Sequence, residues 1–305
     1  MELLKKLCSC PAVCGNEEQI RELIKKEIDL EYTEDNPGNL VFHKKGEGES
    51  IVIALPLDTP GGYITHIDDK GFLRFSPVGG FTPAENMHVI LKSGRYGVIG
   101  KDKNDELFID IGAKDFEEAQ SSADVSDFFA PSAPVNQSGD MLTAFAAGSR
   151  AAIAAVIEVA KAHTKRDVYF AFVSKCSTPR QIAPVFLKSI LPQSIITVET
   201  ARANDIPAEK NVFISLGGGA VIKVKDASLL SSPDLLKEIY AKTADMKVQR
   251  EVSEDRGIGE ALQTAYKPLR CAGISIPTRY KGSLTESVCM SDIQSLTEAI
   301  VRILN

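Results

Sequence analysis

The feature that most constrains the fold is a change of hydrophobic pattern in the middle of the chain. Residues 63–138 contain short β-like runs broken by Gly, Pro and Asp, with helical periodicity only around residues 114–120. Such a stretch is typical of a small β-barrel or sandwich. On both sides of it, apolar strand-like runs alternate with helical patterns, as in an α/β domain. We therefore predict an α/β domain made of residues 1–64 and 139–305, with an inserted β domain at residues 65–138.

The segments on either side of the insert predict the elements of the α/β domain. Residues 51–55 are an unbroken apolar run, which is expected of a strand in a parallel sheet covered on both faces. A metal enzyme can place a His and a carboxylate at the end of such a strand, and here only the carboxylate of Asp58 is present. Further strands are predicted at residues 167–174 and 194–200, and helices at residues 149–163, 231–246, 257–266 and 292–304.

Composition and charge exclude several classes of protein. The 305 residues carry a net charge of −6 and no basic patch, which argues against nucleic-acid binding. No run of 18 apolar residues is present, so no membrane span is expected, and the first ten residues lack the layout of a signal peptide. We expect a cytoplasmic protein with neither nucleic acid nor membrane as a partner.

The cysteines and histidines give no recognisable metal motif. Six cysteines in a chain without a secretion signal are expected to be free thiols. Three of them form a C-x-C-x3-C cluster near the N-terminus, which differs from the C-x2-C pairs of zinc sites; they are Cys8, Cys10 and Cys14. The four histidines are scattered and are expected to be surface or structural residues; they are His43, His66, His88 and His163.

A series of short motifs runs through the chain. They are PAVCGNEE (11–18), DNPGNL (35–40), PLDTPGGYITHIDDKGFL (56–73), LFIDIGAKDFEEA (107–119), LGGGAVIKVKD (216–226) and IPTRYKGSLTESVCMSDI (276–293). Their order and content resemble the glutamyl or tetrahedral aminopeptidases, also called deblocking aminopeptidases, over nearly the whole chain. The resemblance implies an α/β catalytic domain, a centre of two zinc or cobalt ions, and an inserted β domain that drives assembly into dodecamers. It leads us to expect self-association, at least as a dimer.

The positions where that family holds its metals have changed. The resemblance places the ligand positions on Pro56, Gly148, Cys176, Glu199 and Gly282. In the family these positions carry His, a bridging Asp, Glu, Asp and His. Only Glu199 keeps a carboxylate, and a two-metal centre needs four or five donors. We therefore predict no metal and no other cofactor.

The neighbours of those positions support the same prediction. The resemblance places the general base on Lys175, which is cationic at neutral pH unless strongly desolvated. Asp58, which in the family orients the first His, is retained as a residue of the second coordination shell and has no such His beside it. A Thr-Asp pair near the family's substrate pocket falls on Gly257 and Ile258.

Two functional hypotheses remain open. The first is a family homologue without peptidase activity, which acts as a binding, regulatory or structural subunit for a peptide or amino-acid-like ligand. The second is an active peptidase or amidohydrolase, either conventional or with a rebuilt site. In a rebuilt site, Lys175 could acidify Cys176 into a nucleophile, with Ser149 and Glu199 nearby.

Overall fold

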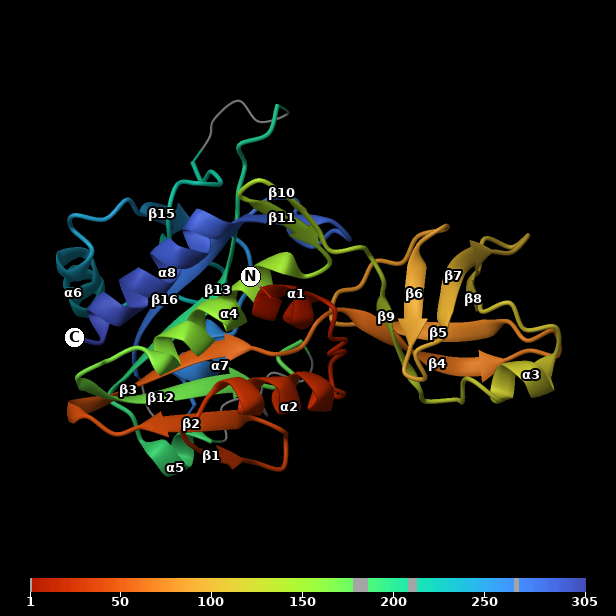
Figure 1. Ribbon diagram of the computed structural model, residues 1–305, viewed down its shortest axis with the longest axis horizontal. Coiled ribbons are helices and arrows are strands. Elements are labelled where there is room, and N and C mark those ends of the chain that lie inside the picture. Colours follow the sequence, from red (N-terminus) through yellow and green to blue (C-terminus); the bar gives the residue numbers. More distant parts are fainter. Residues whose placement is uncertain (1, 178–185, 208–212, 266–268) are drawn as a thin grey trace.

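The computed structural model describes residues 2–177, 186–207, 213–265 and 269–305. Figure 1 shows two parts, a broad sheet with helices on both faces and a barrel beside it. The predicted α/β fold with a small β-barrel is the fold observed. None of the described helices is long and apolar enough to cross a membrane.

The large sheet contains eight strands within the described residues. Its order is β1 (Glu31–Glu34), β2 (Leu40–Lys44), β12 (Arg166–Val173), β3 (Glu47–Pro56), β13 (Ser194–Arg202), β16 (Arg270–Thr278), β14 (Val221–Lys225) and β15 (Gln249–Val252). The four central strands, β12, β3, β13 and β16, are parallel to one another. Strand β3 contains the apolar run at 51–55, which is fully buried as expected for a central parallel strand.

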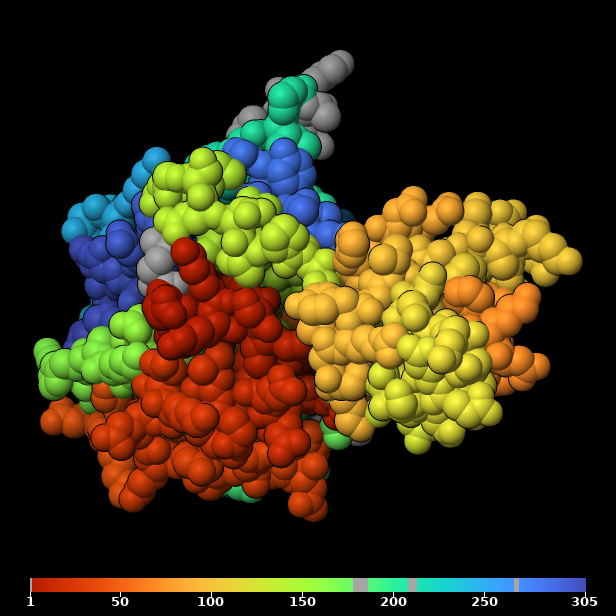
Figure 2. Space-filling view, turned by 45° about the vertical axis from the view of Figure 1, so that its right-hand side comes forward, coloured from red at the N-terminus to blue at the C-terminus, as the bar shows by residue number. Residues whose placement is uncertain are grey.

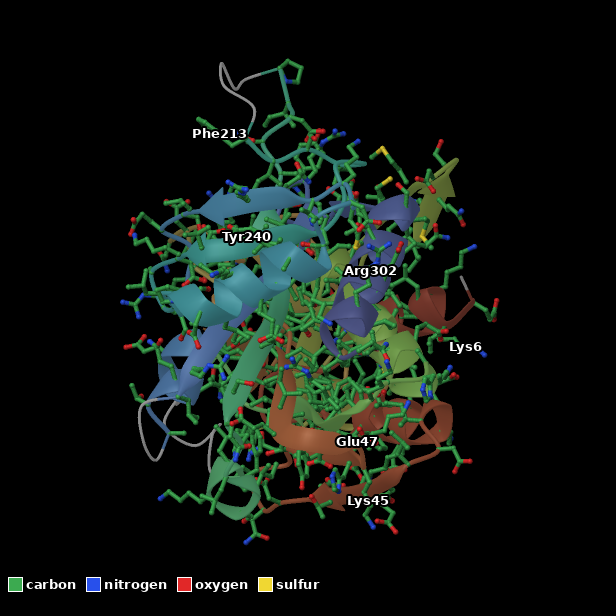
Figure 3. The ribbon with its side chains drawn as sticks, turned by 90° about the vertical axis from the view of Figure 1, so that its left-hand side faces the viewer. Lys6, Lys45, Glu47, Phe213, Tyr240 and Arg302 are labelled. Carbon is green, nitrogen blue, oxygen red and sulfur yellow. The ribbon has the colours of Figure 1, made fainter. Side chains whose placement is uncertain are left out.

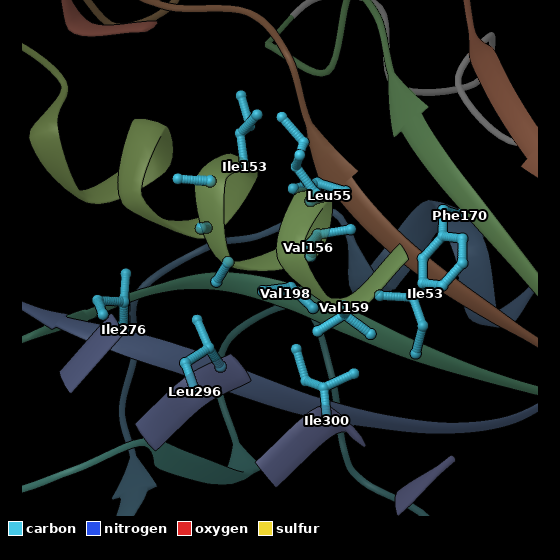
Figure 4. Close-up of a cluster of buried hydrophobic side chains, with 14 of the residues drawn as sticks. Ile53, Leu55, Ile153, Val156, Val159, Phe170, Val198, Ile276, Leu296 and Ile300 are labelled. Atoms are coloured by element: carbon cyan, nitrogen blue, oxygen red, sulfur yellow. The ribbon is translucent and has the colours of Figure 1, made fainter. Parts of the chain in front are cut away.

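Helices cover both faces of this sheet. One face carries α1 (Glu2–Cys8), α2 (Glu18–Glu27), α4 (Ala147–Lys161), α6 (Pro233–Lys242) and α8 (Met290–Ile303), and the other carries α5 (Leu187–Ile190) and α7 (Gly259–Gln263). Helix α4 is almost entirely buried, and its many alanines let it lie close to the strands. Val156 of α4 packs in one cluster with Leu55 of β3 and Leu296 of α8 (Figure 4). Each such fully buried side chain contributes about 1.5–3 kcal/mol.

The barrel closes on itself and so leaves no exposed sheet edge. Its order is β4 (Gly61–Ile67), β5 (Leu73–Val78), β8 (Leu107–Asp110), β7 (Tyr96–Lys101), β6 (His88–Leu91) and β9 (Phe128–Pro131), with α3 (Phe116–Gln120) beside it. A separate core of its own contains Ile64, Leu73, Ile99 and Phe129. The body also contains a three-stranded sheet. Its strands are β10 (Asn136–Ser138) and β11 (Met141–Ala144), which come directly after the barrel in the sequence, and β17 (Glu286–Cys289).

The topology determines where a site can form. Figure 3 shows Lys45 and Glu47 at one end of the body, where the chain turns into the amino end of β3, and Phe213 at the opposite end. Ligand sites of open α/β sheets lie at the carboxyl ends of the parallel strands. The carboxyl end of β3 carries Pro56, and that of β12 is followed by Lys175 and Cys176.

Candidate functional site

A hollow of about 180 Å³ opens at the carboxyl ends of the central parallel strands. We call it the strand-end hollow. Seven of the positions named in the sequence analysis line it: Pro56, Asp58, Ser149, Cys176, Glu199, Gly257 and Ile258. They come from the end of β3, α4, the segment after β12, β13 and the segment before α7, so residues far apart in the sequence meet here. No histidine of the described residues lines this hollow.

Glu199 is the one predicted ligand position that carries a carboxylate, and both of its oxygens have protein partners. Its Oε1 accepts a hydrogen bond from the backbone N–H of Ile258 at 2.9 Å. Its Oε2 pairs with the ammonium of Lys223 at 3.2 Å. A Cβ at Gly257 would lie 1.8 Å from Oε2, so the backbone there can approach only because the residue is glycine. The carboxylate of Glu199 is therefore turned toward protein partners.

Lys223 was not identified from the sequence, and it organises the charges behind Glu199. Its side chain is 2% exposed, and its Nζ also donates to Asp226 Oδ2 at 2.6 Å and lies 3.9 Å from Glu251 Oε2. Burial disfavours its charged form, but the pKa of Lys223 is raised because Glu199 and Glu251 favour the ammonium more strongly. The ammonium of Lys223 thus pairs with the carboxylate of Glu199, which a metal ion at this position would need as a ligand.

Glu286 joins the two glycines that the sequence analysis predicts at ligand positions. Its Oε2 accepts a hydrogen bond from the N–H of Gly148 at 3.0 Å, and its Oε1 accepts one from Gly282 at 2.8 Å. Gly148 lies in the first turn of α4, where a carboxylate also interacts favourably with the helix dipole. Burial raises the pKa of Glu286 despite these two amide donors. Glu286 was not predicted as a site residue, although it lies within the motif at residues 276–293.

Restoring an Asp at position 148 is expected to destabilise the protein. A Cβ there would lie 2.4 Å from Thr278 Oγ1 and 2.6 Å from Thr200 Cγ2. Overpacking of this kind costs about 1–3 kcal/mol. We expect Gly148→Asp to lower the free energy of unfolding in urea by that amount.

Gly148→Ala separates the steric cause from the charge, because the Cβ itself is the clashing atom. It should already show most of the loss. Ser149→Asp is the control on the same turn, since Ser149 lines the strand-end hollow and its side chain has room. If Gly148→Asp proved as stable as the wild type, the ligand position could still be refilled.

Asp58 lacks the His that it orients in the family, and it holds the segment after β12 instead. Its two oxygens accept hydrogen bonds from the backbone N–H groups of Cys176 at 3.2 Å and Ser177 at 2.9 Å. Buried Glu17 accepts another from Lys175 at 3.0 Å, where φ is +54°. A non-glycine residue in this region costs about 1–2 kcal/mol. Asp58 and Glu17 therefore maintain a backbone turn at Lys175, the position predicted for the general base.

The thiol of Cys176 is not prepared for nucleophilic attack. It is buried and donates to the carbonyl of Val173 at 3.1 Å. Burial raises the pKa of Cys176 well above that of an ordinary thiol, and the negative charges of Asp58 and Glu199 raise it further. Lys175 does not line the strand-end hollow. A nucleophilic cysteine needs a lowered pKa, so this environment works against a rebuilt thiol site.

The donors present do not fit a two-metal centre. Pro56, Gly148 and Gly282 offer no side-chain donor, and Glu199 is already engaged. Among the described residues, a different trio could hold an ion, with one ligand atom each from Cys14, Glu17 and Asp58 within 4.8 Å of one another. Both carboxylates of that trio already accept backbone hydrogen bonds. Cys8 and Cys10 are not part of it.

One family of known proteins matches the chain over most of its length. The family model described as M42 glutamyl aminopeptidase matches residues 38–298. A relative from Acetivibrio thermocellus, described as a candidate aminopeptidase, is 34% identical over 98% of this chain and 97% of its own. The lysyl aminopeptidase of Pyrococcus furiosus is 27% identical over 96% of this chain and 93% of its own.

Solved structures of aminopeptidases have the same fold as this chain. An aminopeptidase of the archaeon Desulfurococcus kamchatkensis superimposes with a TM-score of 0.91 and 26% identity, covering 99% of this chain and 93% of its own. The TET1 peptidase of Pyrococcus horikoshii superimposes with a TM-score of 0.85 and 28% identity, covering 99% and 98%. That peptidase assembles into a tetrahedron or a large octahedral shell.

Proposed function

Because the chain belongs to peptidase family M42, we propose that it is a member that has given up the two-metal centre and works by binding rather than by hydrolysis. The observation that carries this proposal is the state of Glu199. Its carboxylate is held by the ammonium of Lys223 and the amide of Ile258, and the other ligand positions of the family offer it no companion carboxylate or imidazole. The general base of a hydrolase is also missing, since its position carries Lys175.

The proposed ligand is a peptide end or an amino-acid-like molecule in the strand-end hollow. About 180 Å³ admits a single residue of such a ligand. Ser149 and Thr200 offer polar groups along its wall, and Val198 offers an apolar one. Lys281 is held in the wall by the carbonyl of Thr200 at 3.0 Å and by Asp255 at 2.9 Å. These groups can orient a ligand, and none of them supplies the activated water that hydrolysis needs.

The chain's arrangement suggests how such a subunit assembles. We propose that residues 1–64 and 139–305, apart from the start of barrel strand β4 at Gly61, form the binding domain, and that the inserted barrel makes contacts between subunits. Self-association is supported by relatives that form large symmetric assemblies. Regulation of an active relative within a mixed assembly is compatible with this arrangement.

The alternative is an active aminopeptidase, which the names of the relatives favour. Hydrolysis of a panel of aminoacyl-p-nitroanilides, measured with added cobalt, with chelator and after thiol alkylation, separates the possibilities. We expect no turnover above the buffer rate under any of these conditions. Turnover that chelator abolishes would establish a conventional metallopeptidase, and turnover that alkylation abolishes would establish a rebuilt cysteine site.

A further inference from the structure

Arg150 is a buried cation that the proposed function does not use. It lies in the first turn of α4, its residue is 1% exposed, and it is among the largest fully buried side chains. Its Nη1 donates to the carbonyl of Leu57 at 2.9 Å, and its Nη2 donates to the carbonyl of Cys10 at 3.2 Å. A guanidinium has five N–H donors, so two neutral acceptors leave it incompletely satisfied.

No carboxylate of the described residues forms an ion pair with Arg150. The carboxylates whose charges act on Arg150 belong to Asp58 and Glu286, and each accepts hydrogen bonds from backbone amides elsewhere. The thiol of Cys8 is neutral at pH 7, because burial raises its pKa to about 12. A buried charge without a counter-charge is unfavourable, and in proteins such groups are almost always paired. An anion from outside the chain would supply a counter-charge in direct contact with the guanidinium.

The same arginine lines a partly open hollow that is large enough for such an anion. A second hollow of about 130 Å³, which we call the joint hollow, lies between the N-terminal segment, the start of α4 and the barrel. Arg150, Cys10 and Ser132 line it, together with Tyr96 of β7. It shares no lining residue with the strand-end hollow. Figure 2 shows the N-terminal residues in red lying directly beside the barrel.

We propose that the joint hollow binds a small oxyanion, a carboxylate or a phosphate, on the guanidinium of Arg150. The planar fork of arginine matches two oxygens of either group. The hydroxyls of Ser132 and Tyr96 are further polar groups in the same lining. The bound anion would sit where the barrel meets the body and would stabilise that joint. This site stands whether or not the strand-end hollow binds a peptide.

The first test measures the melting temperature of the full chain with sodium phosphate, sodium acetate or sodium chloride at equal ionic strength. At an anion concentration well above Kd, about 10 mM for a weak site, we expect a rise of about 2–4 °C with phosphate or acetate over chloride. The better anion tells whether the site prefers a phosphate or a carboxylate. Arg150→Met, which keeps the length and removes the charge, should show no such rise. No rise in the wild type, or an equal rise in the Met variant, would overturn the proposal.

A second pair of variants keeps Arg150 and remains decisive if its replacement does not fold. Ala133 lines the joint hollow and is half-buried. Ala133→Glu supplies a carboxylate from the chain itself, and Ala133→Gln supplies the same shape without charge. In buffer free of oxyanions, we expect the Glu variant to melt above the Gln variant, and the difference to shrink when phosphate is added. A Glu variant that melts no higher than the Gln variant would contradict an uncompensated charge at Arg150.

Discussion

Replacing Lys223 by Met is expected to lower the free energy of unfolding by about 3–5 kcal/mol, because removing one partner of a buried ion cluster leaves the others uncompensated. Three carboxylates depend on this ammonium: Glu199 at 3.2 Å, Asp226 at 2.6 Å and Glu251 at 3.9 Å. All four side chains are less than 10% exposed, so solvent cannot replace the lost cation. Urea unfolding of the variant and the wild type measures the difference.

Lys225→Met is the matched control on the same strand. Lys225 lies two residues along β14, and its side chain is 38% exposed beside a still more solvent-accessible Glu254. Exposed pairs contribute about 0–1 kcal/mol, so this variant should stay close to the wild type. Equal losses in the two variants would mean that the buried cluster has no special role.

Glu251 gives the pH dependence of the same cluster. Burial raises its pKa, and its Oε2 has no hydrogen-bond partner in the described residues. The folded state therefore holds this proton more tightly than the unfolded chain does. The resulting stabilisation is complete below the unfolded pKa and is lost as the pH rises through the folded pKa. Glu251→Gln imitates the protonated form, so at pH 7 it should be at least as stable as the wild type and should lose part of that pH dependence.

Local patterns were sufficient to predict most of the fold. The apolar run at 51–55 became the buried part of β3, and the helix expected at 149–163 became α4, which begins two residues earlier at Ala147. Of the helix expected at 257–266, the last position lies outside the described residues, and the observed helix is Gly259–Gln263. The first two expected positions, Gly257 and Ile258, are used to surround Glu199 instead. The contact of this segment with Glu199 thus determines where α7 begins, which hydrophobic periodicity alone does not predict.

The site was predictable only where a motif fixed the position of a residue. The alignment with family motifs located Pro56, Cys176 and Glu199, and the structure brings all three to one hollow. Partners that come from distant segments were missed. Glu286 reaches Gly148 across 138 positions of sequence, and Lys223 of β14 reaches Glu199 of β13 across β16, which lies between those strands in the sheet. Strand order, and not residue pattern, decides which charges meet.

Cobalt or manganese is expected to leave the melting temperature of the purified protein unchanged. A ligand at a hundredfold excess over its Kd stabilises the native state by about 2.7 kcal/mol, so about 0.1 mM of metal on an intact two-metal centre would raise the melting temperature by several degrees. Here three ligand positions have no donor and Glu199 is held by Lys223. Elemental analysis should likewise find no stoichiometric metal.

Two variants decide what a positive result would mean, because the trio of Cys14, Glu17 and Asp58 is a separate possible ion site. Glu199→Gln removes the charge from the family's ligand position, and Cys14→Ser removes the thiolate donor from the trio. If metal stabilises the wild type and Glu199→Gln abolishes the effect, the family's metal centre is intact and the proposed function is wrong. If Cys14→Ser abolishes the effect instead, the metal is bound by the trio. The proposed loss of the two-metal centre is then not contradicted, because a single ion on the trio leaves the carboxylate of Glu199 with Lys223.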